Sequence, residues 1–351
     1  MEPQHSVIGE RMLAEVCEQS AVVAKVGERY SETQRIVKEL RRRDIRFVLF
    51  VARGTSANAA TYGQYLASVL AGLPTGLASP SIVTQYRADI DLRSCLVIGI
   101  SQSGETPDVA DFLSAARPNA AATLAISNTP ATAVTTATEW WLDCRAGDEL
   151  SVVATKTYTS QLAVLALLFS TWIDRTDVAH ALTSGLPKAI DDTITACLSD
   201  NGPISTFTRE ATPVIARGFN YATAREAALK LREAAQVDAF AYSGAEFLHG
   251  HIAAVDPGQQ VLLFAYPGPT EDGLMTLLHH LRARGARTTV VGSRRLGEQA
   301  TAFIPVDTAL PELISPLLMV VPAQLLSYRL AIDSGLDPDQ PRGLTKVTRT
   351  T

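Results

Sequence analysis

The sequence contains few cysteines and no excess of basic residues, and these two scarcities argue against several classes of protein. The four cysteines stand too far apart for a zinc knuckle or a CxxC redox pair and indicate a reducing cytoplasm; they are Cys17, Cys95, Cys144 and Cys197. Lysine and arginine number 31 against 36 acidic residues, so the formal net charge of −5 argues against a nucleic-acid-binding protein. No charged and then apolar leader follows Met1, so we expect no secretory signal.

Long uninterrupted apolar runs are also missing. The stretch "LAVLALLF" is too short to span a membrane, and Pro316 and Pro322 interrupt "ELISPLLMVVPAQLL", so we predict no membrane span. Apolar residues nevertheless make up 46% of the chain and charged residues 19%, a balance typical of a packed globular protein. A length of 351 residues predicts two or three domains.

Short apolar runs of strand length alternate with longer helical patterns, and the alternation occurs twice. Alternation of this kind predicts parallel sheets with helices on both faces. The first series has strands at 45–52, 95–100 and 121–127 and helices at 57–72 and 107–116; the second has strands at 213–220, 261–270 and 288–293 and helices at 221–235 and 272–285. The interval is 164 residues from Ala52 to Ala216 and 165 residues from Leu96 to Val261, which predicts a duplicated α/β unit.

The other segments complete a predicted domain plan. Residues 9–26 have the pattern of one amphipathic helix, residues 157–173 that of a buried helix, and the polar tail that of irregular chain. We predict a helical segment at 1–40, two α/β domains at 41–180 and 206–335, a linker at 181–205 and a tail at 336–351.

The stretch "SQSGETPD" lies between a buried strand and a helix, with hydroxyl groups on Ser101, Ser103 and Thr106. Ligands bind at the carboxyl ends of the strands in parallel α/β sheets. Thr106 suits a helix N-cap, and the free N–H groups of such a terminus, approached past Gly104, can hold a phosphate without lysine. The GxxxxGK[ST] and GxGxxG nucleotide motifs are absent. An ordinary hydroxyl-rich turn fits the same residues.

A second loop, "RGTSAN", favours the phosphate interpretation. It places Thr55 and Ser56 after the preceding strand of the same predicted domain, so two hydroxyl-bearing loops converge at one sheet edge. The matching loops of the second copy, "RGFNYA" and "YPGPTEDG", lack this pattern. We therefore predict one phosphate site per chain, in the first domain.

Glu226, Lys230 and Glu233 share one face of a predicted helix, at positions i, i+4 and i+7. A solvated helix face explains such a pattern, but this helix starts at the functional edge of the second sheet, where a carboxylate beside a lysine suits proton abstraction next to a carbonyl. His249 and His251 follow in a glycine-containing loop; no third ligand has suitable spacing, so we expect no metal and assign this loop to proton transfer or to packing.

Six ordered motifs are similar to those of the sugar isomerase (SIS) family, most closely the isomerase half of glucosamine-6-phosphate synthase: "RGTSAN", "SQSGET", "ELSVVATKTYTSQL", "ALKLREAAQVDAFAY", "GAEFLHG" and "DQPRGLTK". The resemblance runs over nearly the whole chain. It implies an α/β fold of two tandem SIS domains, each a parallel sheet flanked by helices in a flavodoxin-like αβα sandwich, and no cofactor.

The resemblance also implies roles for individual residues. Glu233 would move a proton between C1 and C2 of a sugar, with Glu226 and Lys230 beside it. His249 would open the sugar ring from the partner subunit, which implies a homodimer, and Lys346 would approach the sugar carbonyl from a lid-like tail. The implied phosphate-binding set is Thr55, Ser56, Ser101, Gln102, Ser103 and Thr106, with the backbone near Val152.

Some features depart from the synthase pattern. The chain starts Met1-Glu2, without the N-terminal cysteine nucleophile of a glutaminase domain, so we expect no glutamine-dependent amide transfer. Ala154 replaces a serine of the motif and His251 replaces a proline, which leaves the exact substrate open.

Every reaction open to such a site begins with phosphate binding, ring opening and removal of the C2 proton. A free 2-amino group leads from glucosamine 6-phosphate to fructose 6-phosphate and ammonia, which we favour. An acetylated nitrogen leads instead to loss of the 3-hydroxyl, as in an N-acetylglucosamine-6-phosphate dehydratase. Plain aldose–ketose isomerisation and deglycation begin in the same way and differ only in the group at C2. A non-catalytic sugar-phosphate sensor is the alternative of another class, although a sensor has no use for Glu233, His249 and Lys346 together.

Overall fold

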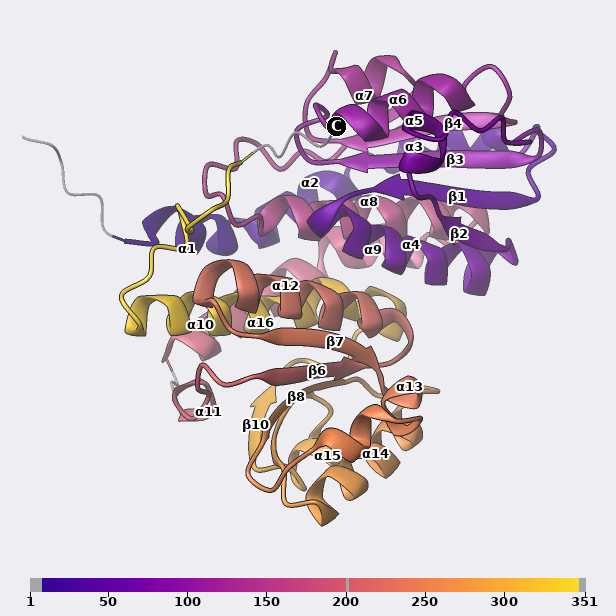
Figure 1. Cartoon of the computed structure of the whole chain (residues 1–351). Helices are drawn as coiled ribbons and strands as arrows, with labels where there is room; N and C mark the ends of the chain where they lie inside the picture. Colours follow the sequence, from indigo (N-terminus) through magenta and orange to yellow (C-terminus); the bar gives the residue numbers. More distant parts are fainter. Residues whose placement is uncertain (1–7, 200–201, 347–351) are drawn as a thin grey trace, which may run out of the picture. The chain divides into compact units, whose positions relative to one another are not determined.

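The chain forms two compact units, each built on a five-stranded parallel sheet, in a computed structural model that describes residues 8–199 and 202–346 (Figure 1). Within these residues, unit 1 comprises 8–20, 149–155, 188–199 and 202–346, and unit 2 comprises 21–148 and 156–187. The units therefore interleave along the chain, whereas the predicted domains follow one another. Residues 149–155 in particular lie inside the first predicted domain but belong to the unit of the second.

The sheet of unit 2 has its strands in the order β2-β1-β3-β4-β5. Its strands are β1 (Phe47–Ala52), β2 (Thr75–Leu77), β3 (Cys95–Ser101), β4 (Ala122–Ser127) and β5 (Trp140–Asp143). All six residues of β4 are buried, because helices cover both faces of the sheet and an apolar run suits such a strand better than alternation.

Helices cover the two faces of this sheet in two groups (Figure 1). The helices α4 (Gly54–Ala71) and α8 (Lys156–Trp172) pack together on one face, with α3 (Tyr30–Leu40) against α8. The other face carries α5 (Ser81–Thr84), α6 (Pro107–Ala116) and α7 (Ala133–Thr136). The remaining helix of unit 2 is α9 (Asp177–Thr183), and the residues of α2 (Gln19–Gly27) and α10 (Gly185–Ser199) are divided between the units.

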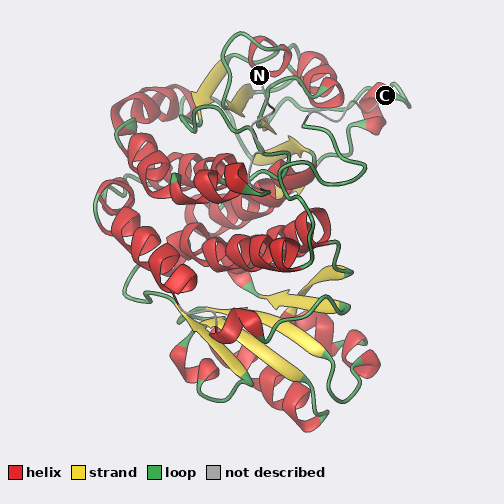
Figure 2. Cartoon of the chain, turned by 90° about the vertical axis from the view of Figure 1, so that its left-hand side faces the viewer, coloured by secondary structure: helices red, strands yellow, loops and turns green. Residues whose placement is uncertain are grey.

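Unit 1 repeats the same plan with the order β10-β9-β8-β6-β7. The strands are β6 (Thr212–Ala216), β7 (Ala239–Ser243), β8 (Gln260–Ala265), β9 (Arg287–Gly292) and β10 (Ala302–Pro305). One face packs against α12 (Tyr221–Ala235) and α16 (Ser315–Asp333), and the other against α13 (Gly244–Leu248), α14 (Glu271–Ala283) and α15 (Arg294–Gly297) (Figures 1 and 2). The helix α1 (Glu10–Cys17) packs on α16, and short helical turns are α11 (Gly202–Ser205), η1 (Gly218–Asn220), η2 (His251–Ala254) and η3 (Glu312–Ile314).

The predicted duplication and fold class are confirmed, because the two sheets share one strand order when numbered within their own units. β6 begins at Thr212 and β1 at Phe47, an interval of 165 residues, and β8 follows β3 by the same interval. The order reverses between β1 and β3 in unit 2, and between β6 and β8 in unit 1. Such a switch point leaves a crevice at the carboxyl ends of the strands.

Two local predictions are wrong. Residues 9–26 form not one helix but two, α1 and α2, because the helix is interrupted at Glu18. Pro322 does not break its apolar stretch: it lies inside α16, and Pro316 lies in the first turn, where a missing N–H costs no helical bond. By length and composition the segment Glu312–Asp333 could cross a membrane, but 89% of its apolar window is buried inside the structure, as is usual for a core helix.

Candidate active site

The two hydroxyl-rich loops of the sequence lie at the switch point of unit 2, where β1 leads into α4 and β3 leads into α6. The two helices lie on opposite faces of the sheet, so their N-termini both open towards the crevice between the strand ends. Backbone N–H groups at helix N-termini favour an anion. The loops thus supply two anion-binding helix ends at one sheet edge.

The hydroxyl groups of the β3 loop form a connected cluster. The Ser101 Oγ accepts a hydrogen bond from the N–H of Gly104 at 3.1 Å and lies 2.9 Å from the Thr106 Oγ1. The Ser103 Oγ accepts from the N–H of Glu105 at 3.2 Å. Thr106 occupies the N-cap of α6 as predicted, but its side chain makes no capping hydrogen bond. Its hydroxyl is joined to the cluster instead.

Gly104 is required by the shape of this loop. Its φ of 71° lies in the left-handed region, and a Cβ at this position would meet the Thr132 Oγ1 at 2.1 Å. No other residue fits without displacing Thr132. Gly104 itself is buried and its N–H is bonded to the Ser101 Oγ, so the glycine fixes the course of the loop around the Ser101 and Thr106 hydroxyl groups.

The β1 loop places its hydroxyl groups in the first turn of α4. Thr55 is partly buried and Ser56 is 7% exposed. The Ser56 Oγ accepts a hydrogen bond from the Gln161 Nε2 of α8 at 3.0 Å. Gln161 was not singled out from the sequence, although it lies in one of the family motifs, and its contact orients the Ser56 hydroxyl.

A positively charged side chain also lies at this switch point, although the β3 loop itself contains none. Arg53 at the N-cap of α4 donates from Nε to the Asp108 Oδ2 at 2.6 Å, and its Nη2 is also 2.6 Å from that oxygen. The Asp108 side chain is 7% exposed and the Arg53 side chain 49%. The second Asp108 oxygen is buried and has no hydrogen-bond partner among the described residues. The guanidinium therefore neutralises a carboxylate that would repel a phosphate at α6.

In unit 1, the structure brings Glu226, Lys230 and Glu233 of α12 into one ion-paired cluster. The Lys230 Nζ lies 3.3 Å from the Glu226 Oε1 and 2.5 Å from the Glu233 Oε2. The side chains of Lys230 and Glu226 are fully buried, whereas that of Glu233 is 23% exposed. Glu233 is thus the member of the cluster that a substrate can reach.

The cluster keeps its lysine charged. Burial by itself lowers the pKa of Lys230, but the Glu226 and Glu233 carboxylates outweigh burial and raise that pKa above its ordinary value. A permanent ammonium beside an accessible carboxylate can stabilise negative charge that develops when the carboxylate removes a proton.

His249 lies apart from this cluster. It caps α13, its side chain is exposed, and its Nδ1 donates to the Ala245 carbonyl oxygen at 2.7 Å, which leaves Nε2 available. No hydrogen bond or ion pair connects it to α12 among residues 8–199 and 202–346. His251 instead packs against aromatic rings, with ring centroids 4.4 Å from Tyr242 and 6.0 Å from Phe247. The described residues include no group of three or more His, Cys, Asp or Glu side chains that could hold a metal.

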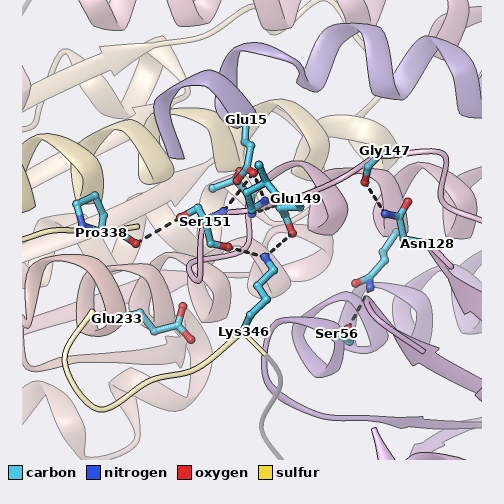
Figure 3. A network of polar contacts seen from close by, with 12 residues as sticks. Glu15, Ser56, Asn128, Gly147, Glu149, Ser151, Glu233, Pro338 and Lys346 are labelled. Carbon is cyan, nitrogen blue, oxygen red and sulfur yellow. Dashed lines mark hydrogen bonds and ion pairs between the residues drawn. The ribbon is translucent and has the colours of Figure 1, made fainter. Parts of the chain in front are cut away.

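Lys346 contacts the loop of residues 149–155 at Glu149 and Ser151 (Figure 3). Val152 belongs to the same loop. The Lys346 Nζ donates to the Ser151 carbonyl oxygen at 2.5 Å and lies 3.5 Å from the Glu149 Oε2. The Val152 N–H donates to the Asp339 carbonyl oxygen at 3.1 Å. The described part of the tail, 336–346, is irregular as predicted and docks on this loop; residues 347–351 lie outside the described residues.

The predicted site residues thus fall into four groups by contact. The side chains predicted to bind the phosphate lie in unit 2, whereas unit 1 holds the α12 cluster, the 149–155 loop with Val152 and the attached Lys346, and His249. Sequence reasoning did not single out the side chains that hold these groups: Glu15, Arg53, Asp108, Glu149, Gln161 and Asp339. The signal for Arg53 and Glu149 was present, since both stand inside or beside motifs that were identified.

Comparison with known proteins places these motifs in a family. The family model described as the SIS domain matches residues 14–171 and 212–334. A glutamine–fructose-6-phosphate aminotransferase (isomerizing) of Methanothermobacter thermautotrophicus is 36% identical over 349 residues, which cover 95% of this chain and 56% of that protein. The chain spans about half the length of the curated relatives it matches.

Solved structures agree in fold. A proposed phosphosugar isomerase of Silicibacter pomeroyi DSS-3 is similar with a TM-score of 0.84 at 29% identity, covering 95% of this chain and 100% of that chain. A glucosamine-6-phosphate deaminase of Thermotoga maritima shares the fold with a TM-score of 0.77 at 23% identity, covering 97% and 100%.

Proposed function

This chain belongs to the SIS domain family, and from that premise we propose that it is an aminosugar 6-phosphate isomerase/deaminase that converts glucosamine 6-phosphate and water to fructose 6-phosphate and ammonia. The observation that carries the proposal is the Lys230 ammonium buried between two carboxylates, of which only Glu233 is accessible. The name of the Methanothermobacter relative contains fructose 6-phosphate and that of the Thermotoga relative glucosamine 6-phosphate, which together support a hexose 6-phosphate, with or without an amino group, as the substrate class.

The loops of unit 2 bind the 6-phosphate in this proposal. The hydroxyl groups of Thr55, Ser56, Ser101, Ser103 and Thr106, the Gln102 loop backbone and the N-termini of α4 and α6 supply donors. Arg53 adds a positive charge next to them. Affinity for the phosphate group is therefore assigned to unit 2.

The α12 cluster of unit 1 performs the proton transfer. After ring opening, Glu233 removes the C2 proton, and the C1 aldehyde becomes an enol whose C2 carries the amino group. Lys230 stabilises the negative charge that passes through this step, and Glu226 keeps Lys230 charged. Return of the proton to C1 gives the C2 imine, and addition of water to the imine releases ammonia and leaves the ketose.

His249 opens the ring, with Nε2 as the exchanging atom, and Lys346 approaches the sugar carbonyl from the tail. His249 is exposed and, within the described part of the chain, has no hydrogen bond or ion pair to α12, which supports its contribution to the site of a second copy of the chain. We accordingly propose a cytoplasmic homodimer whose reaction needs no cofactor.

Product analysis tests this function. The protein is incubated separately with glucosamine 6-phosphate and N-acetylglucosamine 6-phosphate, and ammonia, fructose 6-phosphate and ultraviolet absorbance are followed over time. Equal amounts of ammonia and fructose 6-phosphate from the free amine support the deaminase. An unsaturated product from the acetylated sugar without ammonia replaces it with the dehydratase, and binding without turnover replaces it with the sensor.

A matched pair of variants ties the activity to the cluster. Glu233→Gln removes the base and is expected to abolish turnover while sugar-phosphate binding persists. Glu298→Gln alters an exposed carboxylate of the same unit and leaves turnover unchanged. Residual activity of Glu233→Gln near the wild-type level contradicts the assignment of the base.

A further inference from the structure

The loop of residues 149–155 is held from two directions within unit 1. One is the helix α1, through Glu15, and the other is the C-terminal tail, through Pro338, Asp339 and Lys346 (Figure 3). None of the α1 contacts was foreseen from the sequence. They matter because family resemblance assigns Val152 and Lys346 to the substrate. Val152 is part of this loop, and Lys346 contacts it.

Glu15 is the α1 side of this arrangement. Its side chain lies on the buried face of α1, and the residue is only 4% exposed. Its Oε1 accepts hydrogen bonds from the backbone N–H groups of both Leu150 and Ser151, the latter at 3.2 Å. One buried oxygen atom thus sets the orientation of two successive peptide groups.

The next peptide group along the chain, between Ser151 and Val152, contacts Lys346. The Ser151 carbonyl oxygen accepts from the Lys346 Nζ at 2.5 Å. Glu149, one residue before Leu150, is fully buried; its Oε1 accepts from the Thr155 N–H at 2.8 Å and its Oε2 lies 3.5 Å from the same Lys346 Nζ. A change in the Leu150 and Ser151 peptides therefore moves both groups that hold the ammonium.

Two further contacts join the loop and the tail to the helices of unit 1. The Asp339 carboxylate accepts hydrogen bonds from the N–H groups of Arg11 and Met12 at 3.0 and 2.8 Å, so the tail is also bonded to the start of α1. Met12 and Val153 share a buried cluster with Ala234, the neighbour of Glu233. The loop that holds Lys346 is in this way packed on the helix that carries the base.

We call the contacts of Glu15, Glu149 and Lys346 with the 149–155 loop the clamp. In the clamp two buried carboxyl groups face one ammonium, so their negative charges are only partly neutralised. Burial and then the Glu149 carboxylate raise the pKa of Glu15 to about 7, against the opposing effect of the Leu150 and Ser151 N–H groups and of Lys346. A neutral Glu15 still accepts hydrogen bonds. Acceptance of the two N–H bonds is thus the property that positions the loop.

We propose that Glu15 is a positioning residue for the reaction: by accepting the Leu150 and Ser151 N–H bonds it sets the loop whose Glu149 carboxylate and Ser151 carbonyl hold the Lys346 ammonium. The inference rests on the proposed function, in which Lys346 approaches the sugar carbonyl. In this proposal Glu15 acts through the loop and not on the substrate itself.

Chemical labelling of Lys346 tests the clamp without any need for turnover. Full-length wild type, Glu15→Leu, Glu15→Gln and the control Glu10→Gln are treated briefly with acetic anhydride, and acetylation of Lys346 is measured by peptide mass spectrometry. Glu15→Leu loses both acceptor contacts, so its Lys346 is expected to be acetylated several-fold faster. Glu15→Gln keeps an acceptor oxygen and stays near wild type, as does Glu10→Gln, an exposed position on the same helix.

Kinetics with glucosamine 6-phosphate supply the second readout. Glu15→Leu is expected to lower kcat by about 10- to 100-fold, since a misplaced group loses its effective concentration, while KM changes less than about two-fold. Glu15→Gln restores most of kcat. If Glu15→Leu fails to fold, Glu15→Asp, which withdraws the carboxylate by one methylene, replaces it in both assays with a smaller change in the same direction.

The outcomes separate the two proposals. Equal acetylation of Lys346 in wild type and in folded Glu15→Leu or Glu15→Asp overturns the positioning role. Absence of turnover by the wild type overturns the proposed function, and the labelling result still decides the clamp.

Discussion

Arg53 and Asp108 form an ion pair of 2.6 Å that joins the N-termini of α4 and α6, the two helices that begin at the switch point of unit 2. The pair lies among the hydroxyl groups assigned to the phosphate. Since Asp108 is nearly buried and Arg53 is half exposed, the guanidinium can turn to an incoming phosphate and remain close to its carboxylate.

Replacement of Arg53 by methionine is predicted to weaken binding of the sugar phosphate. Loss of a charged hydrogen bond of about 1.5–3 kcal/mol corresponds to a KM raised about 10- to 100-fold. Inorganic phosphate should lose inhibitory potency in parallel, measured as its inhibition constant. Arg46→Met serves as the control because Arg46 is exposed and pairs locally with Asp44. An unchanged KM contradicts a role of Arg53 in phosphate binding.

Lys230→Met is predicted to destabilise the fold as well as to abolish activity. It removes the ammonium that pairs with the fully buried Glu226, and breaking a buried pair costs about 3–5 kcal/mol. The free energy of unfolding in urea measures the effect. The double variant Glu226→Gln/Lys230→Met should recover part of this loss, since the buried charge is also removed; a simple sum of the two single effects would count against this explanation.

Gly104→Ala is predicted to cost more stability than Gly147→Ala, although both glycines have positive φ angles, 71° and 65°. A Cβ at Gly147 meets nothing within 4 Å, so only backbone strain of about 1–2 kcal/mol applies there. At Gly104 the added methyl also collides with Thr132 and displaces the hydroxyl loop. Thermal unfolding and KM together check this, and equal effects of the two substitutions refute the steric argument.

Mixed dimers test the position of His249. His249→Ala and Glu233→Gln are each expected to be inactive, but a heterodimer of the two contains one intact site if the histidine serves the partner copy. Random mixing during refolding or coexpression should then restore about one quarter of wild-type activity. Activity assays on the mixture decide the matter, because no activity returns if each histidine serves its own chain.

Glu15 is predicted to make stability depend on pH. Its folded-state pKa of about 7 lies above the ordinary value of 4.5, so the folded state favours the protonated form. The resulting stabilisation is present below about pH 4.5 and is lost as the pH rises to about 7. As the pH rises over this interval, the free energy of unfolding of the wild type should therefore fall by up to about 3 kcal/mol relative to that of Glu15→Gln, at about 1.4 kcal/mol per pKa unit. Urea unfolding of both proteins between pH 4.5 and pH 8 measures this change. A difference in unfolding free energy between the two proteins that stays constant with pH contradicts the prediction.

The central elements of both sheets could be predicted from the sequence, whereas their edges could not. The strands β1, β3, β4 and β8 are mostly apolar segments of six or seven residues, and β9 is half apolar. A run buried on both faces carries its own signal. The edge strands β2 and β10 have only three and four residues and are partly exposed. Their existence depends on hydrogen bonds to neighbouring strands, which no local pattern records.

The candidate site divides in the same way. The spacing of Glu226, Lys230 and Glu233 is enough to place them on one helix face, because a helix brings i, i+4 and i+7 together. Glu15 had only a weak signal, a carboxylate on the buried face of α1 near Met12 and Val16. Its partners, Leu150 and Ser151, lie 135 and 136 residues away.

The sequence by itself determined the duplicated α/β plan, the hydroxyl loops and the ionisable helix, because each depends on contacts between residues close in the chain. Only the tertiary structure decided the Arg53–Asp108 pair, the full burial of Lys230 and Glu226, and the clamp of Glu15 on the loop that holds Lys346. These features join segments that are far apart in sequence, and their partners are selected by the packing of whole elements rather than by local propensity.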